Sequence, residues 1–185
     1  GLGDVYKRQV DEQTGCLFAV TLDSKLMANE YMHKSAVWWI DEYLRLMRIK
    51  LQGDNEPALQ AMFRYIKLVR KYETNVVPSP KYSSGTLGLA EAGIKRLQSQ
   101  VRTLQVDLES RYKLTITPEH VTWPWLVRHS TWCIDRFAVR KHGRTGFMQL
   151  NDCGYRGEVV VFGEVVLWRI PMPSHRGVGG GVFET

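Results

Sequence analysis

Two acidic residues stand where metal-dependent chemistry is commonly built. Asp54 follows a short apolar stretch, and Glu91 opens a long basic segment after a loop rich in Ser and Gly. Two-metal phosphoryl transfer requires carboxylates from separate elements that converge on cations about 4 Å apart. Strand ends and first helical turns suit this task because they are rigid and open to solvent. Asp54 and Glu91 are therefore the candidate catalytic residues and ligands of a divalent metal.

Spacing alone favours a plainer interpretation of the same two acids. Asp54 can serve as a turn or N-cap residue before a helix that begins at Pro57. Glu91 can be a solvated acid in the first turns of a helix, where the helix dipole favours negative charge. The choice between these interpretations depends on the rest of the chain.

The hydrophobic pattern predicts strands that alternate with helices. Val10 and Asp11 end a strand, residues 12–15 form a turn, and residues 16–22 return as a second strand. Apolar spacings of three and four predict helices over residues 29–47, 57–71, 87–112 and about 124–136. Short strands are expected at residues 48–52, 75–77, 159–162 and 165–168, with a loop at 78–85. This order predicts an α/β domain with a mixed sheet.

Composition sets limits on the class of protein. The chain has 185 residues, of which 44% are hydrophobic and 24% charged, as in one soluble globular domain. Its net charge of +6 raises the odds of a polyanionic partner, although charge alone is weak evidence. Cys16, Cys133 and Cys153 form no CxxC pair, so neither a disulfide framework nor a zinc ribbon is indicated. No apolar run reaches the roughly 20 residues of a membrane span, and we expect a soluble, intracellular protein.

Several short segments, in a fixed order, carry a family resemblance. Asp54 is followed by Asn, Glu and Pro, and Gly88 lies three residues before Glu91. Further matching segments are residues 100–104, 124–129, 135–137, 143–145 and 162–164. Together they resemble the catalytic core of retroviral and retrotransposon integrases, over about residues 10–170.

The resemblance implies a ribonuclease-H-like mixed sheet flanked by helices. It also implies a two-metal site for Mg²⁺ or Mn²⁺ at Asp54 and Glu91, which processes element DNA ends and joins them to target DNA. Lys95 matches a family position that contacts the DNA end, Arg102 is plausible for the same reason, and Arg96 and Lys81 are weaker candidates; each can also be a solvated surface residue. The parent protein is expected to form homo-oligomers and to act in the nucleus or a cytoplasmic particle, without a membrane partner.

The chain also departs from the family pattern. Leu87 and Ala92 replace an Asn and a common Arg, and the first catalytic Asp is missing. Asp11 is the only upstream candidate of comparable spacing, but its surroundings resemble the family's second strand and turn. We therefore expect a truncated fragment that binds the metal ions weakly or not at all and is inactive, so the two-metal site belongs to the complete parent. A non-catalytic nucleic-acid-binding or assembly module of the same fold is the alternative.

Three regions are expected along the chain. Residues 1–9 resemble the translated end of a sequencing adapter, residues 10–153 form the core-like domain without its first strand, and residues 154–185 begin a small β module with a Gly-rich tail. Trp123, Trp125 and Trp132 are expected in the core, with a base-stacking platform as the minority interpretation, and His129 is expected to be packed rather than a ligand.

Overall fold

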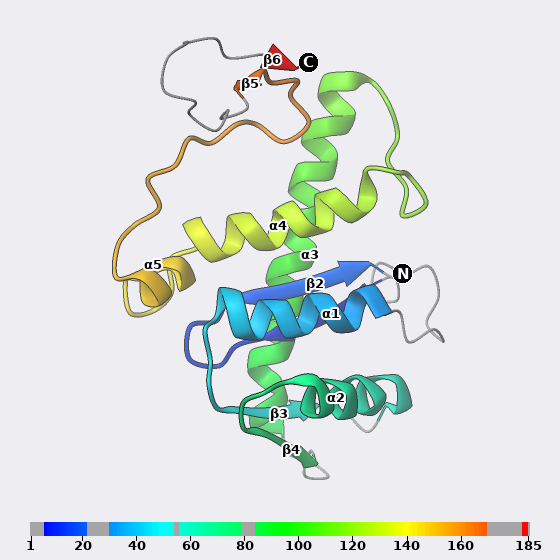
Figure 1. Ribbon diagram of the computed structural model, residues 1–185. Coiled ribbons are helices and arrows are strands. Elements are labelled where there is room, and N and C mark those ends of the chain that lie inside the picture. Colours follow the sequence, from blue (N-terminus) through cyan, green and yellow to red (C-terminus); the bar gives the residue numbers. More distant parts are fainter. Residues whose placement is uncertain (1–5, 22–29, 54–55, 79–83, 170–182, 185) are drawn as a thin grey trace, which may run out of the picture.

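The computed structural model describes residues 6–21, 30–53, 56–78, 84–169 and 183–184 (Figure 1). Asp54 and Lys81 lie outside these residues. The described elements form a mixed α/β fold of small sheets and helices. Within the described part of the chain, no helix combines the length and apolar character that crossing a bilayer requires.

The predicted hairpin is confirmed. Strand β1 (Tyr6–Val10) pairs antiparallel with β2 (Leu17–Thr21), with Val10 opposite Leu17. The backbone of residues 6–9, the stretch that resembles an adapter sequence, forms most of the ladder with β2. The turn between the strands includes Gly15 at φ 66°, a left-handed conformation that glycine adopts without strain.

A β-α-β unit follows the hairpin. Helix α1 (Glu30–Trp38) continues into a π-helical turn, η1 (Trp39–Tyr43), and the chain then leaves the helix with Arg45 at φ 55°. This left-handed residue explains why the helix ends before Met47, where the sequence pattern placed its end. Strand β3 (Ile49–Gly53) and the parallel strand β4 (Thr74–Pro78) are joined by helix α2 (Pro57–Val69), close to the predicted ranges.

Three more helices follow β4 within the described residues. Helix α3 (Ser84–Tyr112) begins earlier than predicted, so Gly85 belongs to the helix and not to the preceding loop. Helix α4 (Trp123–Phe137) matches its predicted range, and a short helix α5 (Gly146–Asn151) follows. Figure 1 shows α3 running the length of the molecule with α4 crossing it.

Apolar side chains form two buried clusters. One joins the hairpin to α3 and α4 and is built around Leu97, Val101, Trp123 and Leu126, each at most 1% exposed. The other joins α1, η1 and α2 around Cys16 and residues such as Met62 and Ile66. The hairpin connects both clusters, because Leu17 of β2 belongs to the first cluster and the adjacent Cys16 belongs to the second.

The predicted continuous mixed sheet is not seen among the described residues. They form three separate two-stranded ladders: β1 with β2, β3 with β4, and β5 (Trp168–Arg169) with β6 (Phe183–Glu184). Within the described ranges, no strand bridges the first two ladders. The β-α-β unit nevertheless supplies the parallel pairing that a mixed sheet requires.

Two sequence-based expectations about apolar residues are wrong. Of the runs predicted as strands, residues 159–162 and 165–168, only Trp168 lies in a strand, β5. Trp125 is 64% exposed, whereas Trp123 is 1% exposed. Residues two positions apart point to different faces of a helix, so α4 can bury only one of these two indoles. His129 is packed as expected, with its ring stacked on Trp132 and Phe162.

Candidate functional site

One solvent-facing side of α3 carries Glu91, Lys95 and Arg102. Their spacings of four and seven residues place them on the same helical face, and all three side chains are exposed. Leu97, Val101 and Leu108 form the buried side of the helix. In the described part of the structure, the three polar side chains make no ion pair or hydrogen bond with one another or with other residues. All three side chains are exposed, so a ligand in solvent can reach them.

The other predicted basic residues do not join this face. Arg96 is exposed but lies about 140° around α3 from Glu91, given 100° per residue. Lys81 and Asp54 lie outside the described residues, so the approach of Asp54 to Glu91 stays a prediction. Among the residues that can be described, no group of three or more His, Cys, Asp or Glu side chains is arranged to hold a metal ion.

Two glycines near the candidate acids in the sequence allow the backbone to pack closely against neighbouring side chains. At Gly53, the end of β3, an added Cβ would lie 2.6 Å from Leu59 and 3.1 Å from Phe63, so the strand end rests directly on α2. At Gly93, an added Cβ would lie 2.7 Å from Val10 and 3.0 Å from Leu17. The N-terminal part of α3 therefore lies directly on the hairpin. This contact fixes the helical turn that carries Glu91.

Asp11 has a local role in the hairpin turn. Its Oδ2 accepts hydrogen bonds from the backbone N–H of Thr14 at 2.7 Å and from the Thr14 hydroxyl at 2.6 Å. This Asx-type turn accounts for an acid at this position without a metal. Metal binding by Asp11 stays a prediction, and the observed contacts favour the turn.

A buried carboxyl that sequence reasoning missed lies at the end of α4. Asp135, only 4% exposed, accepts a hydrogen bond from the N–H of Leu17 at 2.8 Å and one from the Tyr43 hydroxyl at 3.1 Å. Burial raises the pKa of Asp135 to about 7. Its carboxyl joins α4 to β2 and η1, which is a structural role. The available signal was an acid within the apolar pattern of a helix.

A shallow hollow lies between β2, α1 and the start of α4. It is lined by Ala19, Val20, Thr21, Tyr31, Pro124, Trp125 and Arg128. Arg128 donates a hydrogen bond to the Tyr31 hydroxyl at 3.2 Å, and Trp125 exposes most of its indole. Exposed aromatic rings beside a guanidinium are suited to stacking with bases or to a protein contact.

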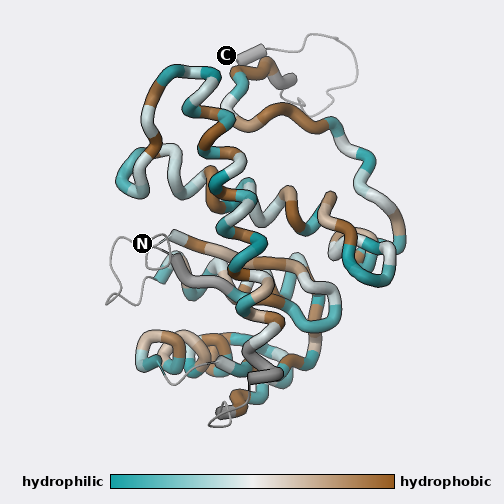
Figure 2. Tube along the Cα trace, turned by 180° about the vertical axis from the view of Figure 1, so that it is seen from behind, coloured by the Kyte–Doolittle hydropathy of each residue, from teal (hydrophilic) through white to brown (hydrophobic). Residues whose placement is uncertain are grey.

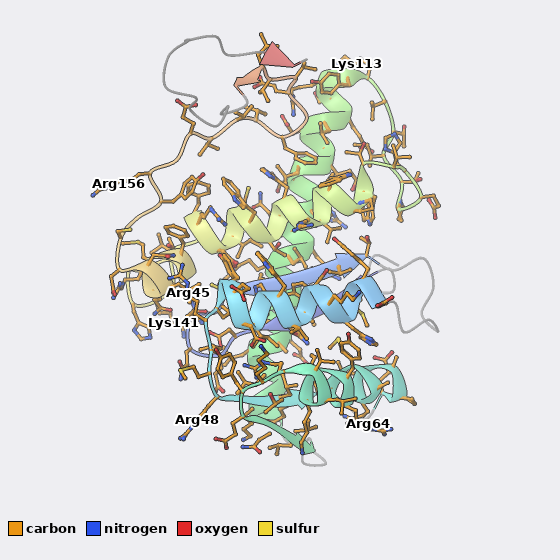
Figure 3. The ribbon with its side chains drawn as sticks, viewed as in Figure 1. Arg45, Arg48, Arg64, Lys113, Lys141 and Arg156 are labelled. Carbon is orange, nitrogen blue, oxygen red and sulfur yellow. The ribbon has the colours of Figure 1, made fainter. Side chains whose placement is uncertain are left out.

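Positive charge is spread over the molecule. Figure 3 labels Arg64 on α2 and Arg45, Lys113, Lys141 and Arg156 in turns and loops between the elements. The labelled residues form no single basic patch. The net charge therefore does not by itself identify a binding surface. The case for the α3 face depends on Glu91, Lys95 and Arg102.

Comparisons with known proteins give a likeness of fold. No protein-family model and no curated protein matches the sequence. The structure is similar to a chain in the simian T-cell lymphotropic virus intasome in complex with PP2A regulatory subunit B56 gamma, with a TM-score of 0.55 and 15% identity. That match covers 96% of this chain and 62% of the other, so this chain spans less than two thirds of it.

The structure is also similar to the catalytic core domain of BIV integrase, with a TM-score of 0.48 and 12% identity. That match covers 80% of this chain and 91% of the other. The chain thus has a mixed α/β fold like that of a chain in a retroviral intasome.

Proposed function

We propose that the complete parent protein is an integrase that processes the DNA ends of a retrotransposon and joins them to target DNA. The observation that carries this proposal is the exposed face of α3, where Glu91 shares one side with Lys95 and Arg102. The likeness of fold to a chain in a retroviral intasome supports it. The family-like segments around Asp54 and Glu91 add support from the sequence.

In this proposal each side chain has a defined task. Asp54 and Glu91 hold Mg²⁺ or Mn²⁺, which would supply charge stabilisation for in-line phosphoryl transfer. Lys95 and Arg102 neutralise phosphates of the DNA end and fix its position, which are tasks that Lys and Arg perform without reading sequence. Two matched carboxylates are too few ligands for two Mg²⁺ ions, which require near-ideal oxygen octahedra, so we expect this chain to be inactive.

A non-catalytic nucleic-acid-binding or assembly module is the second candidate. The hollow lined by Tyr31, Trp125 and Arg128 favours it, since such a surface binds without chemistry. In that case DNA or protein binding would depend on Trp125 and not on Glu91.

DNA binding can be tested by fluorescence anisotropy with a labelled blunt duplex. Reversal of charge in Lys95→Glu or Arg102→Glu should weaken binding about tenfold each at 0.1 M salt and lower the salt slope by about 1. Arg64→Glu is the matched control, because Arg64 is exposed on α2 and points away from the body (Figure 3). Equal effects of all three variants would show that the α3 face has no special role.

The metal site can be tested separately by Mn²⁺ binding, measured by electron paramagnetic resonance. Asp54→Asn and Glu91→Gln should each weaken binding, and the double variant should add little because the two acids would share the ions. Binding that is unaffected by either change would refute the paired site. DNA strand transfer by the unaltered chain would refute its predicted inactivity and leave the paired site intact.

A further inference from the structure

The segment between α5 and β5 contains a short repeat whose apolar residues are exposed. Residues 157–162 read GEVVVF and residues 163–168 read GEVVLW. Val159, Val160 and Val161 are 56%, 44% and 51% exposed, and Val165 is 88% exposed. Figure 2 shows this run as a brown stretch of tube near the C-terminal end. β-Branched residues in extended backbone normally pack on a neighbouring strand, so this segment lacks its usual cover.

The turn between the two repeats is anchored to the helices. Arg111 donates a hydrogen bond to the carbonyl of Phe162 at 2.6 Å, and the Tyr112 hydroxyl donates one to the carbonyl of Gly163 at 2.9 Å. The Phe162 ring also stacks on His129, with centroids 4.8 Å apart. The first repeat is therefore held at its C-terminal end, which lowers the entropy cost of pairing with another strand.

The geometry of the turn keeps the repeats from pairing with each other. The N–H of Glu164 donates to the carbonyl of Val161 at 3.1 Å, and Gly163 at φ 86° lies third in this turn, as in type II. Tight hairpins use type I′ or II′ turns, because type II splays the flanking strands. The valines of both repeats consequently stay open, and Figure 1 shows the chain from α5 to β5 running outside the helices.

We propose that residues 158–162 pair antiparallel with the same residues of a second copy, with Val160 opposite Val160. This register places Glu158 opposite Phe162 and so separates the two carboxylates, whereas a parallel in-register pair would place Glu158 against Glu158. It also brings the outward-pointing Arg156 of each copy beside the turn that carries Glu164 in the other copy. Charge complementarity thus favours one arrangement.

The surface available for this contact sets its strength. A ladder of five residues buries far less than the roughly 1,200 Å² of a stable interface, so the dimer should be weak and concentration-dependent. This pairing uses no residue of the α3 face, and it is independent of the proposed function.

In the proposed register Val160 lies opposite Val160 of the second copy, so substitutions at this position test the pairing directly. Sedimentation velocity at high protein concentration measures the dimer. The unaltered chain should show a concentration-dependent dimer, whereas Val160→Glu and Val160→Lys should each remain monomeric. An equimolar mixture of the two variants should dimerise again, and this recovery would also show that both are folded. Val121→Glu is the control, because Val121 is 84% exposed outside the segment, and it should dimerise like the unaltered chain.

Other outcomes would overturn the proposal. A monomer at every concentration of the unaltered chain would exclude the contact. A dimer that persists in Val160→Glu, or a mixture that stays monomeric, would place the contact elsewhere or in another register.

Discussion

At the scale of single residues, Asp135 is a buried acid whose protonation is strongly altered by its surroundings. Its carboxyl is buried between the N–H of Leu17 and the hydroxyl of Tyr43, and burial raises its pKa from the usual value near 4 to about 7. Between these pH values the folded protein retains a proton that the unfolded chain releases. The contribution of Asp135 to the free energy of unfolding is therefore fully present below about pH 4 and is lost as the pH rises to about 7.

Asp135→Asn should remove this pH dependence while its amide oxygen still accepts from Leu17. We expect the free energy of unfolding of the unaltered chain to fall, relative to the variant, by up to about 1.4 kcal/mol per pH unit between pH 4 and 7. Urea unfolding across this range measures the difference. Comparison with the variant is needed because burial lowers the pKa of His33, which acts in the opposite direction. Parallel pH curves for the two proteins would contradict the prediction.

Arg70 is a second residue whose environment gives a clear expectation. Its side chain is 0% exposed, its Nε lies 2.6 Å from Asp41, and it donates to the Thr74 hydroxyl at 2.7 Å. Arg70→Met should cost about 3 to 5 kcal/mol, because it leaves Asp41 largely buried and unpaired.

The exposed pair of Arg48 and Glu73 gives the control for this experiment. Its side chains are 85% and 54% exposed, so Arg48→Met should cost less than about 1 kcal/mol. Urea unfolding of the two variants gives both values. Similar losses would mean that the Arg70 contacts add nothing beyond a surface pair.

At the scale of elements, the contact of α3 with the hairpin depends on the absence of a side chain at Gly93. Alanine favours a helix over glycine by about 1 kcal/mol, yet its Cβ at this position would lie 2.7 Å from Val10. Overpacking of this kind typically costs about 1 to 3 kcal/mol. Gly93→Ala should therefore destabilise the fold and displace the turn that carries Glu91.

Gly88 provides a matched comparison in the same helix. An added Cβ there meets nothing within 4 Å, so Gly88→Ala should be neutral or stabilising by up to about 1 kcal/mol. Thermal or urea unfolding of the two variants separates them. If both alanines stabilised the protein, close approach of α3 to β1 would not be a constraint.

At the scale of the whole molecule, the sequence predicted local elements better than their assembly. The hairpin and the helices from Pro57 and Trp123 follow from turn residues and apolar spacing, which act within a few residues. The buried positions of Asp135 and Arg70 depend on contacts between distant segments. The two indoles differ, because helical spacing from Leu126, Val127 and Ile134 places Trp123 and not Trp125 on the buried face of α4.

The candidate site shows the same division. Helical spacing places Glu91, Lys95 and Arg102 together, and their exposure is observed. Periodicity could likewise exclude Arg96 from that face. The approach of Asp54 depends on how β3 and α3 meet in three dimensions, which local pattern does not determine.

The hairpin links both buried clusters, so its integrity should govern the stability of the whole molecule. Deletion of residues 1–9 leaves one edge of β2 without most of its backbone partners. Loss of about four net hydrogen bonds should cost about 3 to 5 kcal/mol in urea unfolding.

Replacement of residues 6–9 by four threonines should preserve most of that stability, because the ladder uses backbone groups and threonine favours strands. This pair of variants separates the backbone from the particular side chains of the adapter-like stretch. A deletion with unchanged stability would show that β1 is dispensable. A threonine variant as unstable as the deletion would show that the side chains of residues 6–9 hold the hairpin in place, and that this stretch acts as a specific part of the fold.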